Sequence, residues 1–317
     1  MGGGGQCGDA AEKSTRTCGV NFLVMKKFLV LCLVLFLVVP LQAASTVGIP
    51  EGKGQVTVGQ GERAIQVYTY KPKGFSNGPI FFVFHGAKRN AEDYRNWTIS
   101  LAEKYHAIVA APFFDQDRFL AHLYSWGGIL SKDGKLRDSS KWSFPLATEV
   151  IQSILKGEGD RKRDHYLLGH SGGGQFLTRY VAMESVTAKR VIAANAGTYP
   201  FPRLDWDWGY GFGKLPKDLQ KDDRFKQMLG TPMTIYLGLA DTSDSTESGN
   251  FDASDDANRQ GKVRLDRGRN FFKYSEKLAK DKGWKFNWTK VEVPDVGHDA
   301  NLMFNDLRFE KAIGVRR

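Results

Sequence analysis

The sequence predicts an α/β protein with a mainly parallel central sheet and helices on both faces. Three observations support this prediction. Short apolar segments alternate with amphipathic ones along the chain. A Gly-x-Ser-x-Gly motif joins one apolar segment to a helical one. The 317 residues contain no internal repeat and no break in composition, so a single folded domain is predicted over residues 44–317.

The amino-terminal region reads as a targeting segment that precedes the fold. Residues 25–43 combine two lysines, an unbroken apolar run and a small residue at the end, which is typical of a secretory signal peptide. The apolar run is too short to span a bilayer, so no stable membrane anchor is expected after cleavage. Residues 1–24 resemble no part of a signal and are interpreted as a non-native or misassigned leader. A secreted or periplasmic protein is therefore predicted.

Composition excludes several classes of protein. The three cysteines (Cys7, Cys18 and Cys32) all lie near the amino terminus, so the folded domain has no disulfide framework and no cysteine-based zinc site. Cleavage after Ala43 removes four basic and two acidic residues and lowers the formal charge from +10 to +8. No cluster of basic residues with interleaved aromatics is present, so no nucleic-acid partner is expected. The sequence does not indicate an oligomeric state.

The strands are expected in a regular order. Residues 65–70 alternate apolar and polar side chains, as in a half-buried strand. Residues 80–84 are continuously apolar, as in a strand covered on both faces. A similar run ends at Pro112, and the alternating segment 286–293 is expected near an edge. The full set of predicted strands is 65–70, 80–84, 107–111, 166–168, 191–194, 233–237 and 286–293.

Helices are expected between these strands, and two stretches do not fit the alternation. The predicted helices are 91–104, 144–155, 173–184, 267–280 and 301–313. Residues 198–228 carry many aromatic side chains among glycines and prolines. Residues 243–256 are polar and acidic and are expected to form a solvated loop. A calcium site there is not favoured, because the carboxylates lack the spacing of an EF-hand loop, and no metal or cofactor is expected elsewhere.

Ser171 is the candidate nucleophile. It lies at the centre of Gly169-His170-Ser171-Gly172-Gly173, between a predicted strand and a predicted helix. A turn this tight has no room for side chains beside the serine, and it lifts the hydroxyl above the sheet edge. The amino terminus of the following helix favours negative charge developing nearby. The alternative is a glycine-rich turn with a purely structural role.

A serine nucleophile requires a base, and the base requires an orienting acid. His298 follows the last predicted strand, whereas the other five histidines come earlier in the chain. Asp241 leaves the strand 233–237 first and is the preferred acid, with Asp244 kept as the alternative. The oxyanion hole is expected to use the backbone N–H groups of Gly172 and Ala87, with Gly86 as the alternative to Ala87.

These motifs together resemble a known family. The segments HGAKRNAEDYR (85–95), GHSGGG (169–174), GLAD (238–241) and VGHD (296–299) are similar to those of α/β-hydrolases. Within them, the chain looks like the secreted poly(3-hydroxybutyrate) depolymerase-like and feruloyl-esterase-like serine esterases. The resemblance implies an α/β-hydrolase fold, cleavage of carboxylic esters, a Ser171–Asp241–His298 triad and no cofactor. The chain lacks the disulfides and separate binding domain that such extracellular depolymerases often carry.

The substrate is predicted only as a class. A small-molecule or polymeric ester is expected, with a short-chain, hydroxyalkanoate or aromatic acid. Tyr199, Trp206 and Trp208 are candidate substrate-binding residues, although closing a small satellite core is an equally good explanation of their aromatic rings. The same two explanations apply to residues 124–128 (YSWGG). The alternative functions are a lipase or serine peptidase on the same fold, or a non-catalytic polymer-binding relative.

Overall fold

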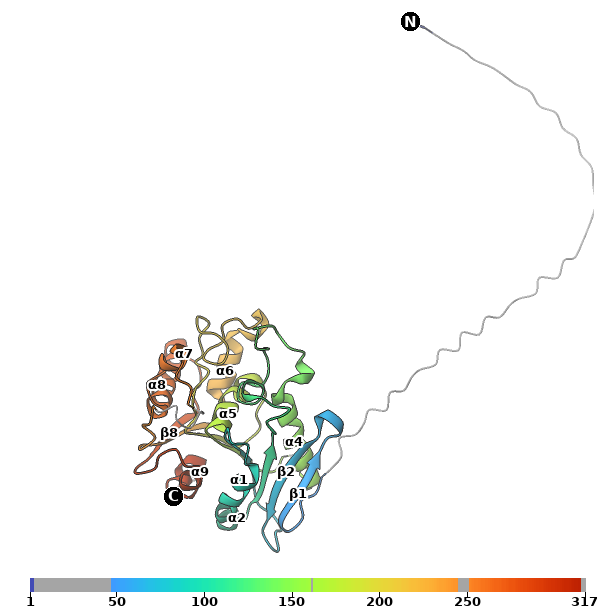
Figure 1. The fold of residues 1–317 in the computed structure, drawn as a ribbon, viewed down its shortest axis with the longest axis vertical. Coiled ribbons are helices and arrows are strands. Elements are labelled where there is room, and N and C mark those ends of the chain that lie inside the picture. The colour runs from blue at the N-terminus through green and yellow to red at the C-terminus, as the bar shows by residue number, and fades with distance from the viewer. Residues whose placement is uncertain (3–46, 161, 245–250, 315–317) are drawn as a thin grey trace, which may run out of the picture. The chain divides into compact units, whose positions relative to one another are not determined.

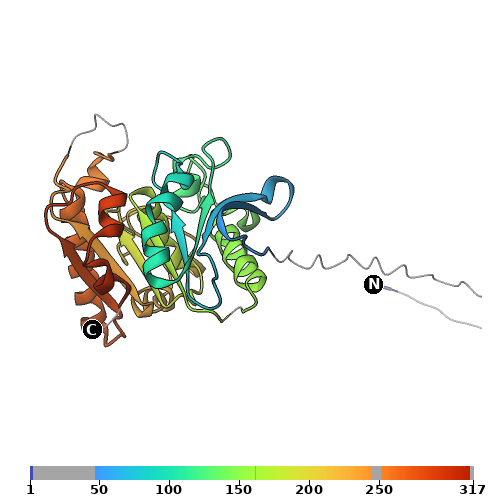
Figure 2. The ribbon, with the colours of Figure 1, turned by 90° about the horizontal axis from the view of Figure 1, so that it is seen from below.

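An eight-stranded sheet forms the centre of the computed structural model, which describes residues 1–2, 47–160, 162–244 and 251–314. The strand order is β1-β2-β4-β3-β5-β6-β7-β8, in which the β1–β2 and β2–β4 pairs are antiparallel and all other pairs are parallel. The β1–β2 pair and β8 lie at opposite edges (Figures 1 and 2). The strands are β1 (Gly52–Val58), β2 (Ile65–Lys71), β3 (Ile80–Phe84), β4 (Ile108–Phe113), β5 (His165–His170), β6 (Arg190–Ala194), β7 (Met233–Gly238) and β8 (Trp288–Val293).

Helices cover both faces of this sheet and create two hydrophobic clusters. One face packs against α4, α5, α6 and α8, and the other packs against α1, α2, α9 and α10. The helices are α1 (Ala91–Trp97), α2 (Ile99–Tyr105), α3 (Ala121–Tyr124), α4 (Ser143–Gly157), α5 (Gly172–Met183), α6 (Asp222–Gly230), α7 (Asp255–Asn258), α8 (Arg264–Lys282), α9 (Ala300–Asn305) and α10 (Phe309–Ile313). Three short 3₁₀ turns, η1 (Gly61–Arg63), η2 (Ser139–Lys141) and η3 (Lys217–Leu219), complete the set.

The continuously apolar sequence of strand β3 is explained by its burial on both faces of the sheet. Phe82 and Phe84 belong to the cluster beneath α4 and α5, whereas Phe81 and Val83 belong to the opposite cluster. All four side chains are fully buried, because successive residues of a strand point to opposite faces and both faces are covered. The predicted α/β architecture with a mostly parallel sheet is therefore confirmed.

Several predicted boundaries are wrong. Pro112 does not end its strand: it lies inside β4, opposite Val67 of β2. The pairing of β4 with β3 stops at Ala110, so the missing N–H of Pro112 falls where only β2 flanks the strand. The predicted helix 91–104 is two helices that meet at Thr98, whose hydroxyl donates to carbonyls of the preceding turn. The predicted helix 301–313 is likewise divided into α9 and α10.

The register of the parallel strands aligns their carboxyl ends. Phe84 pairs with Gly169, and Gly238 pairs with Val293. The segments that follow β3, β5, β7 and β8 therefore emerge at one edge of the sheet. All the candidate catalytic residues lie on these segments, which is the usual position of a site in an open α/β sheet.

Some predictions fall outside the described residues. This group includes the leader 1–24 apart from its first two residues, the signal peptide 25–43, the three cysteines and Glu247 of the acidic loop. From residue 47 onward, the described residues belong to one compact unit. No helix in the described ranges is both long enough and apolar enough to cross a membrane.

Candidate active site

Ser171 occupies the strained turn between β5 and α5. Its φ of 55° and ψ of −116° lie outside the regions that a residue with a side chain prefers. The turn is possible because two neighbours are glycines: a Cβ on Gly169 would lie 2.4 Å from the carbonyl oxygen of Gly173, and one on Gly173 would lie 2.1 Å from that of Phe84. The Ser171 N–H donates to the Ala194 carbonyl at 3.0 Å, which anchors the turn to β6.

The three predicted triad residues form one chain of hydrogen bonds. The Oγ of Ser171 lies 3.0 Å from Nε2 of His298, and Nδ1 of His298 lies 2.8 Å from Oδ2 of Asp241. In the neutral ring, Nδ1–H donates to the carboxylate and Nε2 accepts from the hydroxyl. The Asp241 side chain is 1% exposed and that of His298 is 30% exposed, so the acid is buried while the base reaches solvent. Asp244 is exposed in the following loop.

The loops that carry Asp241 and His298 are bonded directly to each other. The Ala240 N–H donates to the Val296 carbonyl at 3.0 Å. A Cβ on Gly238 would lie 2.3 Å from that same carbonyl oxygen, so a side chain at this position would separate the loops. Asn195, which follows β6, connects them further: it accepts from the Gly238 N–H at 2.8 Å and donates to the Gly297 carbonyl at 2.9 Å.

Two further groups surround the acid and the base. Arg264, at the start of α8, lies 3.6 Å from Oδ1 of Asp241, and the two side chains are 6% and 1% exposed. The His170 ring packs 4.6 Å from that of His298 and contacts the hydroxyl of Tyr94 through Nδ1 at 3.2 Å. Burial holds the pKa of His170 well below its ordinary value, and the nearby His298 and Arg264 lower it further.

The region predicted to be the oxyanion hole brings Gly172 and Ala87 together. A Cβ on Gly172 would lie 3.2 Å from the backbone nitrogen of Ala87 and 3.4 Å from Oγ of Ser125. Glycine therefore keeps this space open. Among the described residues, no backbone carbonyl accepts from the Ala87 N–H. The Gly172 N–H is in the first turn of α5, where the N–H groups have no partner within the helix.

His85 holds the Ala87 loop in place as a neutral ring. Its Nδ1 donates to the Gly86 carbonyl at 2.9 Å, and its Nε2 accepts from the Phe114 N–H at 3.1 Å. A proton on Nε2 would remove that acceptor. Complete burial lowers the pKa of His85 to about 3, in agreement with the tautomer that the two hydrogen bonds require.

A cavity of about 410 Å³ is connected to this region through the chain, although none of Ser171, Gly172, Ala87 or His298 lines it. Trp126 forms part of its wall and directly follows Ser125, the residue that approaches Gly172. The cavity has a mainly apolar wall and a rim of charged side chains. Its lining residues include Trp126, Ile129, Leu130, Lys132, Asp207, Trp208, Tyr210, Lys214 and Asp256.

Only one of the three predicted substrate-binding aromatics lines this cavity. Trp208 does, and its Nε1 donates to the Trp126 carbonyl at 3.2 Å. Tyr199 is fully buried and stacks on Phe271 at 4.8 Å, so the structure corrects the expectation that it faces substrate. Trp206 packs against Phe201 and is not among the cavity residues. For Tyr199 and Trp206, closing a satellite core is the better interpretation.

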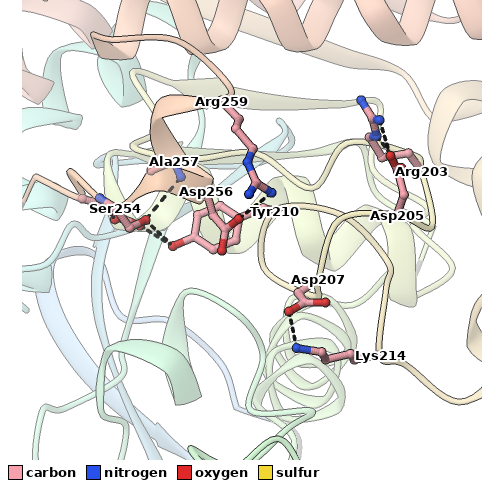
Figure 3. A network of polar contacts seen from close by, with 10 residues as sticks. Arg203, Asp205, Asp207, Tyr210, Lys214, Ser254, Asp256, Ala257 and Arg259 are labelled. Carbon is pink, nitrogen blue, oxygen red and sulfur yellow. Dashed lines mark hydrogen bonds and ion pairs between the residues drawn. The ribbon is translucent and has the colours of Figure 1, made fainter.

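Polar contacts tie the aromatic segment to the segment that follows β7 (Figure 3). The Tyr210 hydroxyl contacts Oγ of Ser254 at 3.1 Å and donates to Asp252 at 2.7 Å. Lys214 pairs with Asp207 at 2.6 Å on the same rim. Two segments far apart in sequence therefore fix one wall of the cavity.

Sequence reasoning missed Asn195 and Arg264. A polar residue directly after β6 was a usable signal for Asn195, because it lies at the same sheet edge as the triad. No sequence pattern pointed to Arg264, whose predicted helix began at residue 267. Among the described residues, no group of three or more His, Cys, Asp or Glu side chains is placed to hold a metal ion.

Comparisons with known proteins agree with this architecture. Neither the protein-family models nor the curated proteins give a match. A solved structure of poly(aspartic acid) hydrolase-1 from Sphingomonas sp. KT-1 is 32% identical with a TM-score of 0.73, and the alignment covers 80% of this chain and 96% of the other. The chain belongs to the α/β-hydrolases.

A second α/β-hydrolase, LpqC, described as a poly(3-hydroxybutyrate) depolymerase from Bordetella parapertussis, is 28% identical with a TM-score of 0.73. That alignment covers 80% of this chain and 88% of LpqC. An IroE-like serine hydrolase from Shewanella oneidensis shares the fold at 12% identity and a TM-score of 0.51, over 82% of this chain and 78% of the other. This α/β-hydrolase is accordingly an esterase of the depolymerase-like kind.

Proposed function

We propose that the protein is a secreted or periplasmic serine hydrolase that cleaves carboxylic esters through Ser171, His298 and Asp241. The observation that carries this proposal is the continuous chain of hydrogen bonds from the Ser171 hydroxyl to the buried Asp241 carboxylate. These hydrogen bonds link the nucleophile to the base and the base to the acid, which is the arrangement that a serine hydrolase requires.

The reaction follows from this geometry. Ser171 Oγ attacks the ester carbonyl carbon while its proton passes to Nε2 of His298. The negative oxygen of the tetrahedral intermediate accepts hydrogen bonds from the N–H groups of Gly172 and Ala87. The imidazolium then returns the proton to the departing alcohol as the C–O bond breaks. Water attacks the acyl-enzyme by the same route and releases the acid, which restores the Ser171 hydroxyl.

The cavity that has Trp126 in its wall is the proposed site for one side of the ester. Its volume lies within the range of small-molecule sites, and Trp126, Trp208 and Tyr210 supply flat apolar surface. A compact acyl chain, a hydroxyalkanoate unit or an aromatic ring fits that chemistry. The relative described as a poly(aspartic acid) hydrolase makes cleavage of an acidic polymer the second candidate.

The proposal is tested with a matched set of substrates and one variant. The substrates are p-nitrophenyl esters of increasing acyl length, a feruloyl ester, emulsified polyhydroxybutyrate, a triglyceride emulsion and poly(aspartic acid). Ser171→Ala should abolish nearly all turnover and all labelling by a fluorophosphonate while the circular dichroism spectrum stays unchanged. Full turnover by this variant would overturn the triad, and no turnover by the wild type on any substrate would favour a non-catalytic relative.

A further inference from the structure

Arg264 is a buried cation whose polar contact is the proposed catalytic acid. Its guanidinium lies 3.6 Å from Oδ1 of Asp241, the oxygen that does not bond His298. The guanidinium also packs over the Phe251 ring, 4.8 Å from its centroid. Among the described residues, Asp241 is the only acid with which Arg264 forms an ion pair.

The neighbouring Arg267 shows what a structural arginine looks like in the same helix. It is also buried and packs over the same Phe251 ring, at 4.5 Å. Its donors, however, bind backbone carbonyls: Gly197, Gly261 and Asp252, each at 2.8 or 2.9 Å. Arg264 donates to no backbone carbonyl of the described residues and is directed at the carboxylate instead.

We propose that Arg264 is a positioning residue for catalysis, which orients the Asp241 carboxylate with Oδ2 toward His298. The inference rests on the proposed function, because it assigns a role to Arg264 through the Asp241–His298 contact. A buried carboxylate is costly unless a cation is paired with it, and Arg264 lies beside Asp241 with both side chains buried. The attraction of the Arg264 guanidinium for Oδ1 also leaves Oδ2 as the oxygen that bonds the ring.

The arginine also moderates the charge that His298 acquires during the reaction. An imidazolium formed at His298 is attracted by Asp241 and repelled by Arg264, so replacing the arginine removes a repulsion from the charged ring. The other titratable groups around the pair include His170, which packs on the His298 ring, Tyr94 beyond it, Tyr199 near Asp241 and Arg267 beside Arg264. Burial raises the pKa of both tyrosines and lowers that of His170, so it favours the neutral form of these three groups.

The test measures how fast a fluorophosphonate labels Ser171 as a function of pH, with the labelled residue identified by mass spectrometry. In Arg264→Met, the acid side of the profile should move to higher pH by roughly half a unit to one unit, and the plateau rate should fall about tenfold. Arg264→Lys keeps the charge and should restore the acid side of the profile. Arg267→Met is the matched control and should lower thermal stability without moving the profile.

The outcomes separate the inference from the proposed function. If wild-type protein is not labelled at Ser171, the triad assignment fails. If labelling occurs and Arg264→Met keeps the wild-type profile, or if Arg267→Met shifts the profile equally, Arg264 has only a structural role and the inference is wrong. If Arg264→Met does not fold, Arg264→Lys provides a second test. A folded lysine variant whose labelling rate does not follow the wild-type pH dependence would also contradict the proposal.

Discussion

Asn195 and Gly297 are joined by a hydrogen bond of 2.9 Å, although they are 102 positions apart in the chain. The amide nitrogen of Asn195 donates this bond, and the amide oxygen of the same side chain accepts from the Gly238 N–H. Asn195 therefore sets the spacing between the strand end that leads to Asp241 and the loop that carries His298. Its side chain is 1% exposed, and its φ of 43° is one that asparagine tolerates better than most residues.

Asn195→Ala should reduce kcat by about 10- to 100-fold, because small displacements of catalytic groups are costly. Leaving the buried Gly238 N–H and Gly297 carbonyl unpaired should also lower the free energy of unfolding by about 1–3 kcal/mol. Denaturant unfolding and steady-state kinetics measure the two effects. The matched control is Asn287→Ala, which removes a side-chain bond to the Gly230 carbonyl at the opposite end of β7. It should destabilise the fold without lowering kcat, and an equal loss of kcat in both variants would contradict the assignment.

Asp241→Asn should reduce kcat by roughly 10³- to 10⁴-fold if the triad behaves as in serine proteases, because the amide favours the wrong histidine tautomer. Asp244→Asn should change kcat little, since that side chain is exposed and does not contact His298. Adding Asp241→Asn to Ser171→Ala should cost almost nothing further, because triad members act as a unit. A large loss of kcat in Asp244→Asn would instead identify Asp244, three residues further along the loop, as the catalytic acid.

His85 should make the fold sensitive to acid. Its pKa is about 3 in the folded protein and about 6.5 when unfolded, so the unfolded chain binds the extra proton first. Stability from this group is complete above pH 6.5 and is lost as the pH falls toward 3. The loss should be about 2 kcal/mol between pH 7.5 and pH 5. Denaturant unfolding of His85→Gln at both pH values should show a flatter dependence, and an unchanged slope would show that other groups control it.

Trp126→Ala should raise KM for an aryl ester by about tenfold with a smaller effect on an acetyl ester, because it removes one aromatic wall of the cavity. Trp206→Ala is the control: it deletes an indole of equal size that packs on Phe201, away from the cavity lining. It should leave KM for both esters near the wild-type value. Equal effects from the two variants would show that the cavity does not hold the substrate.

Much of the fold and of the candidate site could be predicted because both depend on local patterns. Ser171, Asp241 and His298 each follow a strand, and the carboxyl ends of parallel strands meet at one edge. Strand β1 was missed because Gly52 and Gly54 interrupt the apolar alternation that would have marked it. It forms because all seven residues pair with β2.

The parts that escaped prediction depend on tertiary contacts. Nothing local to Tyr199 distinguishes a ring stacked on Phe271 from one that faces a substrate, since Phe271 lies far along the chain. Arg264 resembles any helical arginine until Asp241 is placed beside it. The leader, the signal peptide and secretion stay predictions, because they concern residues that the structure does not describe.

The position of His298 after β8 has a consequence for folding. Strand β8 is the last to appear in the chain and pairs with β7 alone, at the edge opposite β1. A molecule in which the other seven strands have assembled still lacks its base. The recovery of turnover during refolding should therefore report the docking of β8: it should not precede the addition of this strand to the sheet, whatever the order in which the other strands assemble.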